Sequence, residues 1–313
     1  MAKFSSHDIL AGDNRGAIIA MGNFDGFHLG HQAVAGAAKK WAMEEGRPFY
    51  IATFDPHPVR YFMPHAEPFR LTSLNQREKI FSQFGADAML VFDFNETLAN
   101  MSAADFVTKL LAEQLGVAGV VTGQDFTFGK GRSGNAQNLS DYGAPVNLRS
   151  RALSPITNGD EVISSSRIRA ALKNGDIATA QNLLTRPFAI EGEVQHGDKN
   201  GRKFGYPTAN IDMGSYLRPK FGIYAVRGKL PDGGIFDGVA NLGIRPSFTP
   251  PKLLLEPYFF DFQGDLYHQM IEVELLHFIR EEAKFDDMDA LITQMDQDSM
   301  VAKNWLVANL PII

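Results

Sequence analysis

Two histidines, His28 and His31, stand three residues apart in the run GNFDGFHLGH, which follows directly on the apolar run AIIAM of residues 17–21. An apolar run that ends in glycine and continues into a helical pattern predicts a buried strand turning into a helix. The N–H groups and positive dipole end of a helix start suit a phosphate. Two imidazoles there could stabilise charge that moves onto a leaving group. We interpret this turn as a candidate nucleotide site; the alternative is that one histidine caps the helix and the other lies on its surface.

Two further runs combine polar side chains with predicted turns. In ISSSRIR, residues 163–169, hydroxyls and an arginine stand at a predicted helix start, an arrangement suited to phosphates, unless the serine is only an N-cap. In GRKFGYPTAN, residues 201–210, Thr208 and Asn210 lie two apart, so they share one face of an extended segment and could offer two oxygens to Mg²⁺. The alternative for this run is a plain turn followed by a strand.

The predicted secondary-structure elements that position these residues differ between the first and the second part of the chain. Strand-like runs at 17–21, 49–54, 89–92 and 119–122 alternate with helical patterns at 30–45, 74–84, 102–116 and 164–184. Such alternation predicts a parallel sheet with helices on both faces and ligands at the carboxyl ends of its strands.

Beyond a predicted hinge at 185–187, short runs separated by Gly/Pro turns predict an antiparallel sandwich or barrel. These runs lie at 188–195, 222–228, 236–243, 253–262 and 270–278, and a helix from about Met288 closes the chain. We therefore predict two domains, 1–185 and 186–313, as the length also suggests.

The composition excludes several classes of site and partner. The chain has 313 residues, no cysteine and a formal net charge of −6, which rules out disulfides, thiolate metal sites and a cysteine nucleophile. The negative charge argues against a nucleic-acid binder, which needs a basic face, but not against a single nucleotide. No apolar run approaches the ~18 residues of a membrane span, and residues 1–12 lack the apolar core of a signal peptide. We expect a cytoplasmic protein that binds small molecules and neither nucleic acid nor a membrane; a homo-oligomer stays open.

The run GNFDGFHLGH resembles the signature of nucleotidyltransferases that transfer AMP from ATP, in particular the FMN adenylyltransferase module of bacterial bifunctional FAD synthetases. TFDPHP at 53–58, GQDFTFGKG at 123–131 and ISSSRIR at 163–169 are similar to that family's later motifs, in order. The resemblance implies a Rossmann-like domain, with His28 and His31 as catalytic residues. The ATP-binding residues it implies are Gly22, Asn23, Phe24, Asp25, His28, His31, Ser164 and Arg169. The FMN-binding residues it implies are Asp55, His57 and Asp125.

The run GRKFGYPTAN resembles the signature of riboflavin kinases, and the runs at 219–224 and 241–248 match that family's segments in order. The resemblance implies an antiparallel β-barrel closed by a helix, with Glu256 as the catalytic carboxylate and Mg²⁺ held by Thr208 and Asn210. The ATP- and flavin-binding residues it implies are Gly201, Lys203, Gly205, Pro207, Thr208, Asn210 and Arg280. The chain departs from the family pattern at Pro257, where a proline removes a strand N–H, at residues 249–252, and at His268, which replaces a common glycine.

Together the resemblances imply that ATP phosphorylates riboflavin to FMN in the second domain, and that the first domain joins FMN to AMP, which gives FAD and pyrophosphate. Two alternatives remain. One is an FMN adenylyltransferase whose kinase site has decayed; the other is a flavin-binding protein without turnover.

Overall fold

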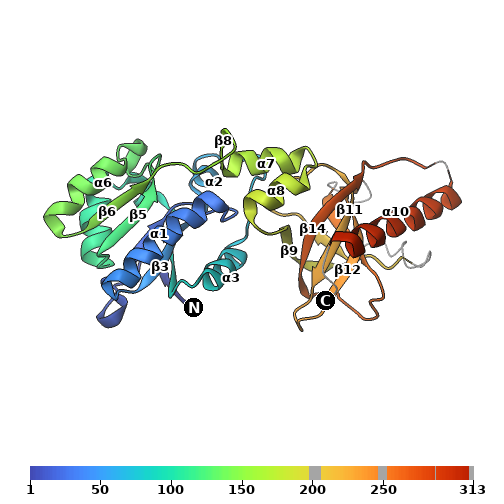
Figure 1. Cartoon of the computed structure of the whole chain (residues 1–313), viewed down its shortest axis with the longest axis horizontal. Helices are drawn as coiled ribbons and strands as arrows, with labels where there is room; N and C mark the ends of the chain where they lie inside the picture. The colour runs from blue at the N-terminus through green and yellow to red at the C-terminus, as the bar shows by residue number, and fades with distance from the viewer. Residues whose placement is uncertain (197–205, 246–251, 286, 310–313) are drawn as a thin grey trace. The chain divides into compact units, whose positions relative to one another are not determined.

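The computed structural model describes residues 1–196, 206–245, 252–285 and 287–309. Two compact units divide the chain (Figure 1). The first comprises Met1–Glu67 and Leu74–Ser164, and the second comprises Pro68–Ser73 and Ser165–Ile313. Each unit is described by itself below.

The first unit contains a six-stranded parallel sheet in the order β1-β4-β3-β2-β5-β6, which confirms the predicted fold class. Its strands are β1 (Ala2–Ser5), β2 (Ile18–Met21), β3 (Phe49–Asp55), β4 (Ala88–Asp93), β5 (Gly119–Gly123) and β6 (Arg149–Leu153). The sequence analysis missed both edge strands, β1 and β6, because an edge strand is partly exposed and lacks the continuous apolar run of a central one. A separate hairpin joins β7 (Thr157–Asn158) and β8 (Glu161–Val162).

Helices cover both faces of this sheet, so that alternate strand residues enter two apolar cores. One core packs Ile18, Ile51 and Val121 against Trp41 and Phe81; the other packs neighbouring strand residues against the helical segment 103–114. The helices are α1 (Leu29–Glu45), α2 (Pro58–Phe62), α3 (Leu74–Phe84), α4 (Glu96–Asn100), α5 (Ala103–Asp105) and α6 (Ala136–Gly143). Short 3₁₀ turns are η1 (Gly12–Asn14), η3 (Lys130–Arg132) and η4 (Ala144–Val146), and α5 continues into a π-helix, η2 (Phe106–Gln114).

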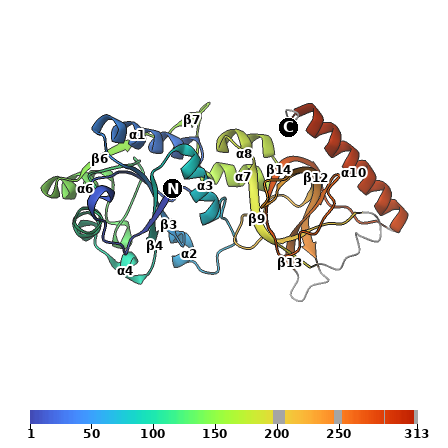
Figure 2. The ribbon, with the colours of Figure 1, turned by 90° about the horizontal axis from the view of Figure 1, so that it is seen from below.

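The second unit is a closed barrel in the order β10-β13-β12-β11-β14-β9, and all its strand pairs are antiparallel. Its strands are β9 (Phe188–Gln195), β10 (Asn210–Asp212), β11 (Gly222–Lys229), β12 (Ile235–Arg245), β13 (Lys252–Phe259) and β14 (Met270–Arg280). The helix α10 (Met288–Asn309) packs along the outside of the barrel (Figure 2), where Ala302 and Leu306 meet Val239 and Leu276. The barrel and its closing helix are as predicted, and the three-residue strand β10 is the strand that the alternative for residues 201–210 expected.

Residues 165–185, which the sequence analysis assigned to the first domain, pack with the barrel instead. They form α7 (Ser165–Lys173) and α8 (Ile177–Leu184). The Lys220 N–H donates to the Leu172 carbonyl at 3.0 Å, and Gly175 leaves room for the Phe278 ring. The two helices bury their apolar faces on the second unit, which their own sequence pattern does not reveal. The segment 68–73 also belongs to the second unit: Arg70 N–H donates to Ser215 O at 3.2 Å.

Candidate functional site

Two buried phenylalanines attach the turn between β2 and α1 to the core of the first unit. Phe24 and Phe27 have positive φ angles of 47° and 41°, and both rings are 1 % exposed. They pack against Phe81 of α3 at 6.1 and 5.1 Å between ring centroids. Burial of these rings stabilises a backbone conformation that non-glycine residues seldom adopt. Because the Phe24 side chain lies in the core, only its backbone can face a ligand at this turn.

His28 and His31 form one stacked pair at the start of α1. The His31 N–H donates to His28 Nδ1 at 3.3 Å, so His28 is the N-cap, as the alternative interpretation proposed. The second ring does not stand apart on the surface, because the two centroids are 3.6 Å apart and the rings nearly parallel at 19°. With Nδ1 accepting, a neutral His28 ring carries its proton on Nε2, where it can donate to an anion. The capping role and a phosphate-binding role are therefore compatible.

Gly30 allows the start of the ISSSRIR motif, residues 163–169, to lie next to this pair. A Cβ at Gly30 would lie 3.1 Å from the His28 ring and 3.4 Å from the Ile163 carbonyl, a spacing that leaves little room for any side chain. Ile163 directly precedes Ser164, so the structure brings Ser164 to the neighbourhood of His28. Arg169 belongs to the second unit, where its Nε donates to Phe69 O at 2.8 Å and its guanidinium lies 5.2 Å from the Phe69 ring.

A buried arginine that the sequence analysis missed joins the first two motifs. Arg77 of α3 is 3 % exposed; its Nη2 donates to Asp55 Oδ1 at 3.1 Å and its Nη1 to Thr53 Oγ1 at 2.6 Å. The Thr53 hydroxyl in turn donates to the Asn23 carbonyl at 2.8 Å. Asp25 is also buried in this turn, at 4 % exposed. Arg77 thus fixes Asn23 relative to Asp55, although an arginine inside a helical pattern gave no sequence signal.

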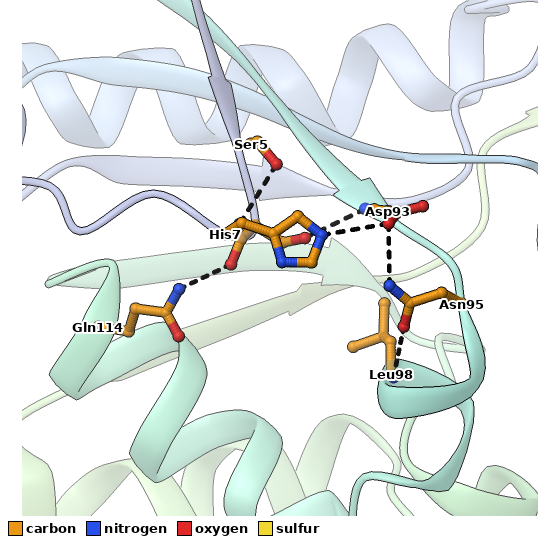
Figure 3. Close-up of polar contacts among 7 residues, drawn as sticks. Ser5, His7, Asp93, Asn95, Leu98 and Gln114 are labelled. Atoms are coloured by element: carbon orange, nitrogen blue, oxygen red, sulfur yellow. Dashed lines mark hydrogen bonds and ion pairs between the residues drawn. The ribbon is translucent and has the colours of Figure 1, made fainter.

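The carboxyl edge of the sheet carries two acidic side chains, and each has its own partner. Asp55 at the end of β3 is in register with Asp93 at the end of β4. Asp93 faces His7 Nε2 at 3.1 Å and accepts from Asn95 at 2.8 Å (Figure 3). The hydrogen bond from His7, followed by that from Asn95, lowers the pKa of the Asp93 carboxyl. Because Arg77 pairs with Asp55, and Asp93 accepts a hydrogen bond from Asn95, these two carboxylates repel an anionic ligand less than unpaired carboxylates would.

Beside Asp55 lies a cluster of four aromatic rings that no motif predicted: Phe54, Tyr61, Phe62 and Phe94. Tyr61 and Phe62 of α2 lie 5.4 and 5.7 Å from Phe94, and Phe62 is 64 % exposed. The helix that carries them is capped by His57, whose Nδ1 accepts from the Val59 N–H at 3.2 Å. Phe62 is the exposed member of this cluster, whereas Phe54 is buried and Tyr61 and Phe94 are partly buried; an exposed aromatic ring suits contact with a flat ring system. Helix α2 has only five residues, so a hydrophobic periodicity could not reveal it.

Asp125 follows β5 at the same edge of the sheet. Next to it, Phe126 and Phe128 stack at 5.8 Å, and Phe128 reaches the core beside Phe106. The structure therefore places Asp55, His57 and Asp125, the three predicted FMN-binding residues, on loops at the carboxyl ends of β3 and β5.

On the barrel, Asn210 and Glu256 occupy neighbouring strand positions. Ile211 and Leu255 are register partners, and the Ala209 N–H donates to the Pro257 carbonyl at 2.9 Å, so Asn210 lies opposite Glu256. Directly opposed side chains on adjacent strands project to one face, with Cβ atoms about 5 Å apart. Asn210 is buried, and Thr208 is partly exposed at the end of the same segment. The Thr hydroxyl, Asn carbonyl and Glu carboxylate supply the hard oxygens that Mg²⁺ prefers, so the donor set fits that ion.

Two departures from the family pattern are accommodated without breaking the barrel. The β12–β13 register continues through Pro257 to Phe259, and on the other side of β13 the Pro257 carbonyl accepts a hydrogen bond from the Ala209 N–H. His268 has a φ of 63°, the left-handed conformation for which glycine is the usual residue. Neither change displaces Glu256 from its place opposite Asn210.

The structure describes only some of the remaining residues that were predicted for the kinase site. Gly201, Lys203 and Gly205 lie outside the described residues, and Pro207 is exposed. Arg280 holds α10 to the barrel: its Nε and Nη2 donate to the two Asp298 oxygens at 2.8 and 2.6 Å. Its role as a flavin or phosphate contact stays a prediction.

Tyr206, two residues before Thr208, contacts both β13 and α10. The Tyr206 ring packs 4.9 Å from Tyr258, and its hydroxyl donates to Asp296 of α10. Burial, with the Asp296 contact second, raises the pKa of Tyr206 to about 12, so the hydroxyl keeps its proton throughout the physiological range. Among the described residues, no group of three or more His, Asp or Glu side chains is placed to hold a metal ion.

Comparisons with known proteins match both units. A family model described as FAD synthetase matches residues 10–167, and one described as riboflavin kinase matches residues 184–306. A relative from Haemophilus influenzae, named bifunctional riboflavin kinase/FMN adenylyltransferase, is 38% identical over 289 residues, covering 92% of this chain and 94% of its own. A Bacillus subtilis relative of the same name is 37% identical over 305 residues, covering 95% and 94%.

One solved structure matches the whole fold. It is described as a macrolide-efflux protein from Streptococcus pneumoniae and superimposes with a TM-score of 0.85 at 28% identity, covering 97% of this chain and 100% of that one. In the part of this chain that the structure describes, no helix is both long and apolar enough to cross a membrane.

Proposed function

The chain belongs to the family of bifunctional riboflavin kinase/FMN adenylyltransferases, and from this premise we propose that it makes FAD from riboflavin in two ATP-dependent steps. The second unit phosphorylates riboflavin to FMN, and the first unit joins FMN to the AMP portion of a second ATP and releases pyrophosphate. The observation that carries the proposal is that each compact unit has its own set of matched polar residues: the His28–His31 pair in one and the Asn210–Glu256 pair in the other.

In the adenylyltransferase step, a phosphate oxygen of FMN attacks the α-phosphorus of ATP, and the bond to pyrophosphate breaks. No covalent intermediate with the protein is needed, so catalysis comes from positioning and charge stabilisation. His28 and His31 donate hydrogen bonds to the triphosphate as negative charge builds on the leaving group. The backbone of residues 22–25, with Ser164, completes the ATP contacts of the first unit; Arg169, predicted as a further ATP contact, belongs to the second unit. Asp55, His57 and Asp125 bind FMN, and the aromatic cluster supports its ring system.

In the kinase step, the terminal hydroxyl of the ribityl chain attacks the γ-phosphorus of ATP, and ADP leaves. Glu256 orients this hydroxyl and accepts its proton. Thr208 and Asn210 would hold Mg²⁺, which when bound neutralises phosphate charge. The remaining residues that we propose to bind ATP and flavin are Gly201, Lys203, Gly205 and Pro207. The intact register of β13 through Pro257 supports a retained kinase site over a decayed one.

One incubation separates the candidate functions. The protein is mixed with riboflavin, ATP and Mg²⁺, and the flavins are resolved chromatographically. FMN and FAD together support the proposal. FAD formed only from added FMN would indicate an adenylyltransferase with a decayed kinase site, and no conversion would indicate a flavin-binding protein without turnover.

Variants then assign the steps to their units. His28→Ala combined with His31→Ala should abolish FAD formation and leave FMN formation intact, while the exposed His65→Ala serves as the matched control. Glu256→Ala should abolish FMN formation and leave FAD formation from FMN intact. If either change removed both activities from a folded protein, the two-site assignment would be wrong. A cytoplasmic location, and small molecules rather than nucleic acid as partners, complete the proposal.

A further inference from the structure

Asn241 lies beside the proposed catalytic carboxylate on the side away from Asn210. It is the register partner of Glu256 across the β12–β13 pair. Two residues along the same strands, Val239 and Tyr258 pack against α10, so Asn241 and Glu256 share the outer face of the barrel on which that helix lies. Asn210, Glu256 and Asn241 therefore form a row of polar side chains across the three adjacent strands β10, β13 and β12.

The side-chain oxygen of Asn241 is buried and has no hydrogen-bond partner among the described residues. On the side away from Glu256 its register partner is Ile223 of β11, an apolar residue that offers no donor. Buried polar groups in native proteins are nearly always hydrogen-bonded, so an orphaned acceptor calls for a donor. Glu256, when ionised, is itself only an acceptor and cannot supply one. A buried water, or a hydroxyl of a molecule that binds beside Glu256, can supply this donor.

The chemistry of ATP and riboflavin decides which of these two substrates supplies the donor. ATP phosphates at neutral pH present acceptor oxygens, which a carbonyl oxygen repels. The ribityl chain carries several hydroxyls, and its terminal hydroxyl is the group that Glu256 orients. We infer that Asn241 Oδ1 accepts a hydrogen bond from the ribityl hydroxyl next to the one that is phosphorylated, which makes Asn241 a flavin-binding residue of the kinase site. This inference rests on the proposed role of Glu256.

The test compares the wild-type full-length chain with Asn241→Ala, which removes the acceptor, and Asn241→Asp, which keeps an oxygen at that position. Kinase kinetics are measured with riboflavin and with its 4′-deoxy analogue, which lacks the neighbouring hydroxyl. Loss of one hydrogen bond to a buried group is worth on the order of tenfold or more in binding. Asn241→Ala should raise the KM for riboflavin about tenfold and leave the KM for ATP and the Mg²⁺ dependence within about twofold. Asn241→Asp should keep the KM for riboflavin closer to that of the wild type.

The analogue makes the test specific to the hydroxyl. The wild type should bind 4′-deoxyriboflavin about tenfold more weakly than riboflavin, whereas Asn241→Ala should show no further loss. The inference would be overturned if the losses caused by Asn241→Ala and by removal of the 4′-hydroxyl multiplied, because the two groups would then act independently. An effect confined to the KM for ATP or to the Mg²⁺ dependence would also overturn it, because Asn241 would then contact the nucleotide.

Two controls keep the outcomes distinct. In Asn241→Ala, two properties should be unchanged: the adenylyltransferase activity with FMN, measured on the same preparation, and the unfolding midpoint reported by Trp305. If either falls, the kinase kinetics of Asn241→Asp are compared with those of the wild type instead. If the wild type makes no FMN, or if Glu256→Gln is fully active, the proposed kinase role of Glu256 fails. If the wild type is active, Glu256→Gln is not, and Asn241→Ala matches the wild type with both flavins, only this inference fails.

Discussion

Arg77 joins Asn23, Thr53 and Asp55 inside the first unit, and replacing it with methionine should destabilise that unit by about 3 kcal/mol. Removing one partner of a buried ion pair costs about 3–5 kcal/mol, because the other charge is left buried without compensation. The Arg77 side chain is 3% exposed but that of Asp55 is 28% exposed, so water partly solvates the carboxylate and the lower end of the range applies. A loss of about 3 kcal/mol lowers the ratio of folded to unfolded protein by about two orders of magnitude.

The chain's two tryptophans allow each unit to be followed separately. Trp41 is buried in the first unit and Trp305 lies on α10 of the second, so Trp305→Phe leaves Trp41 as the single reporter. In that background, urea unfolding of Arg77→Met should show the loss of stability. The matched control is Lys40→Met, which removes an exposed pair with Glu44 at 3.9 Å and should cost less than about 0.5 kcal/mol.

The same substitution should separate the two activities. Because Arg77 fixes Asn23 relative to Asp55, its loss should lower the kcat/KM for FAD formation by about a hundredfold, as a misplacement of about 1 Å can do. FMN formation, assigned to the other unit, should be unchanged. A stability loss below about 1 kcal/mol, or an equal fall in both activities, would refute the reasoning.

Three further predictions concern stability. Hydrogen bonds from Arg149, then Trp41, hold the pKa of Glu45 at about 2, below its usual 4.5. Its ionised form therefore stabilises the first unit above about pH 4.5, and this effect is lost as pH falls through about 2. Urea midpoints of the wild type and Glu45→Gln should differ at pH 6, and the difference should shrink steadily as pH falls from 4.5 toward 2. Arg280→Met leaves Asp298, whose side chain is 6% exposed, with only the hydrogen bond from Gln294 at 3.0 Å and no cationic partner, and should destabilise the second unit by about 3 kcal/mol, monitored through Trp305 in a Trp41→Phe background; an unchanged midpoint would contradict this. Gly222→Ala should cost at least about 2 kcal/mol in the same assay, because φ is 149° and a Cβ would lie 2.2 Å from the Arg280 carbonyl oxygen; full stability would show that the strand can shift.

The sequence predicted the interior elements of both units closely. The runs at 49–54 and 119–122 match β3 and β5 to within one residue, α3 and β9 agree at both ends, and α10 begins at Met288. These segments are buried on defined faces, so their apolar periodicity is strong. The sequence pattern did not reveal β1, β6, α2, α4, α6 and the β7–β8 hairpin, which are short or partly exposed. The predicted domain boundary also assigned α7 and α8 to the first domain, whereas they belong to the second compact unit, because helix periodicity does not say which surface the apolar face meets.

By itself, the sequence determined the two-unit organisation, the central strands and the motifs, since those depend on local pattern and residue type. Only the tertiary structure decided which polar groups meet. Arg77 reaches Asp55 across 22 residues, and Asn241 meets Glu256 across 15, through side chains that belong to different elements. Such pairs depend on strand register and on helix packing, which long-range burial sets. For that reason the residues that position the two sites could not be read from the motifs that first revealed them.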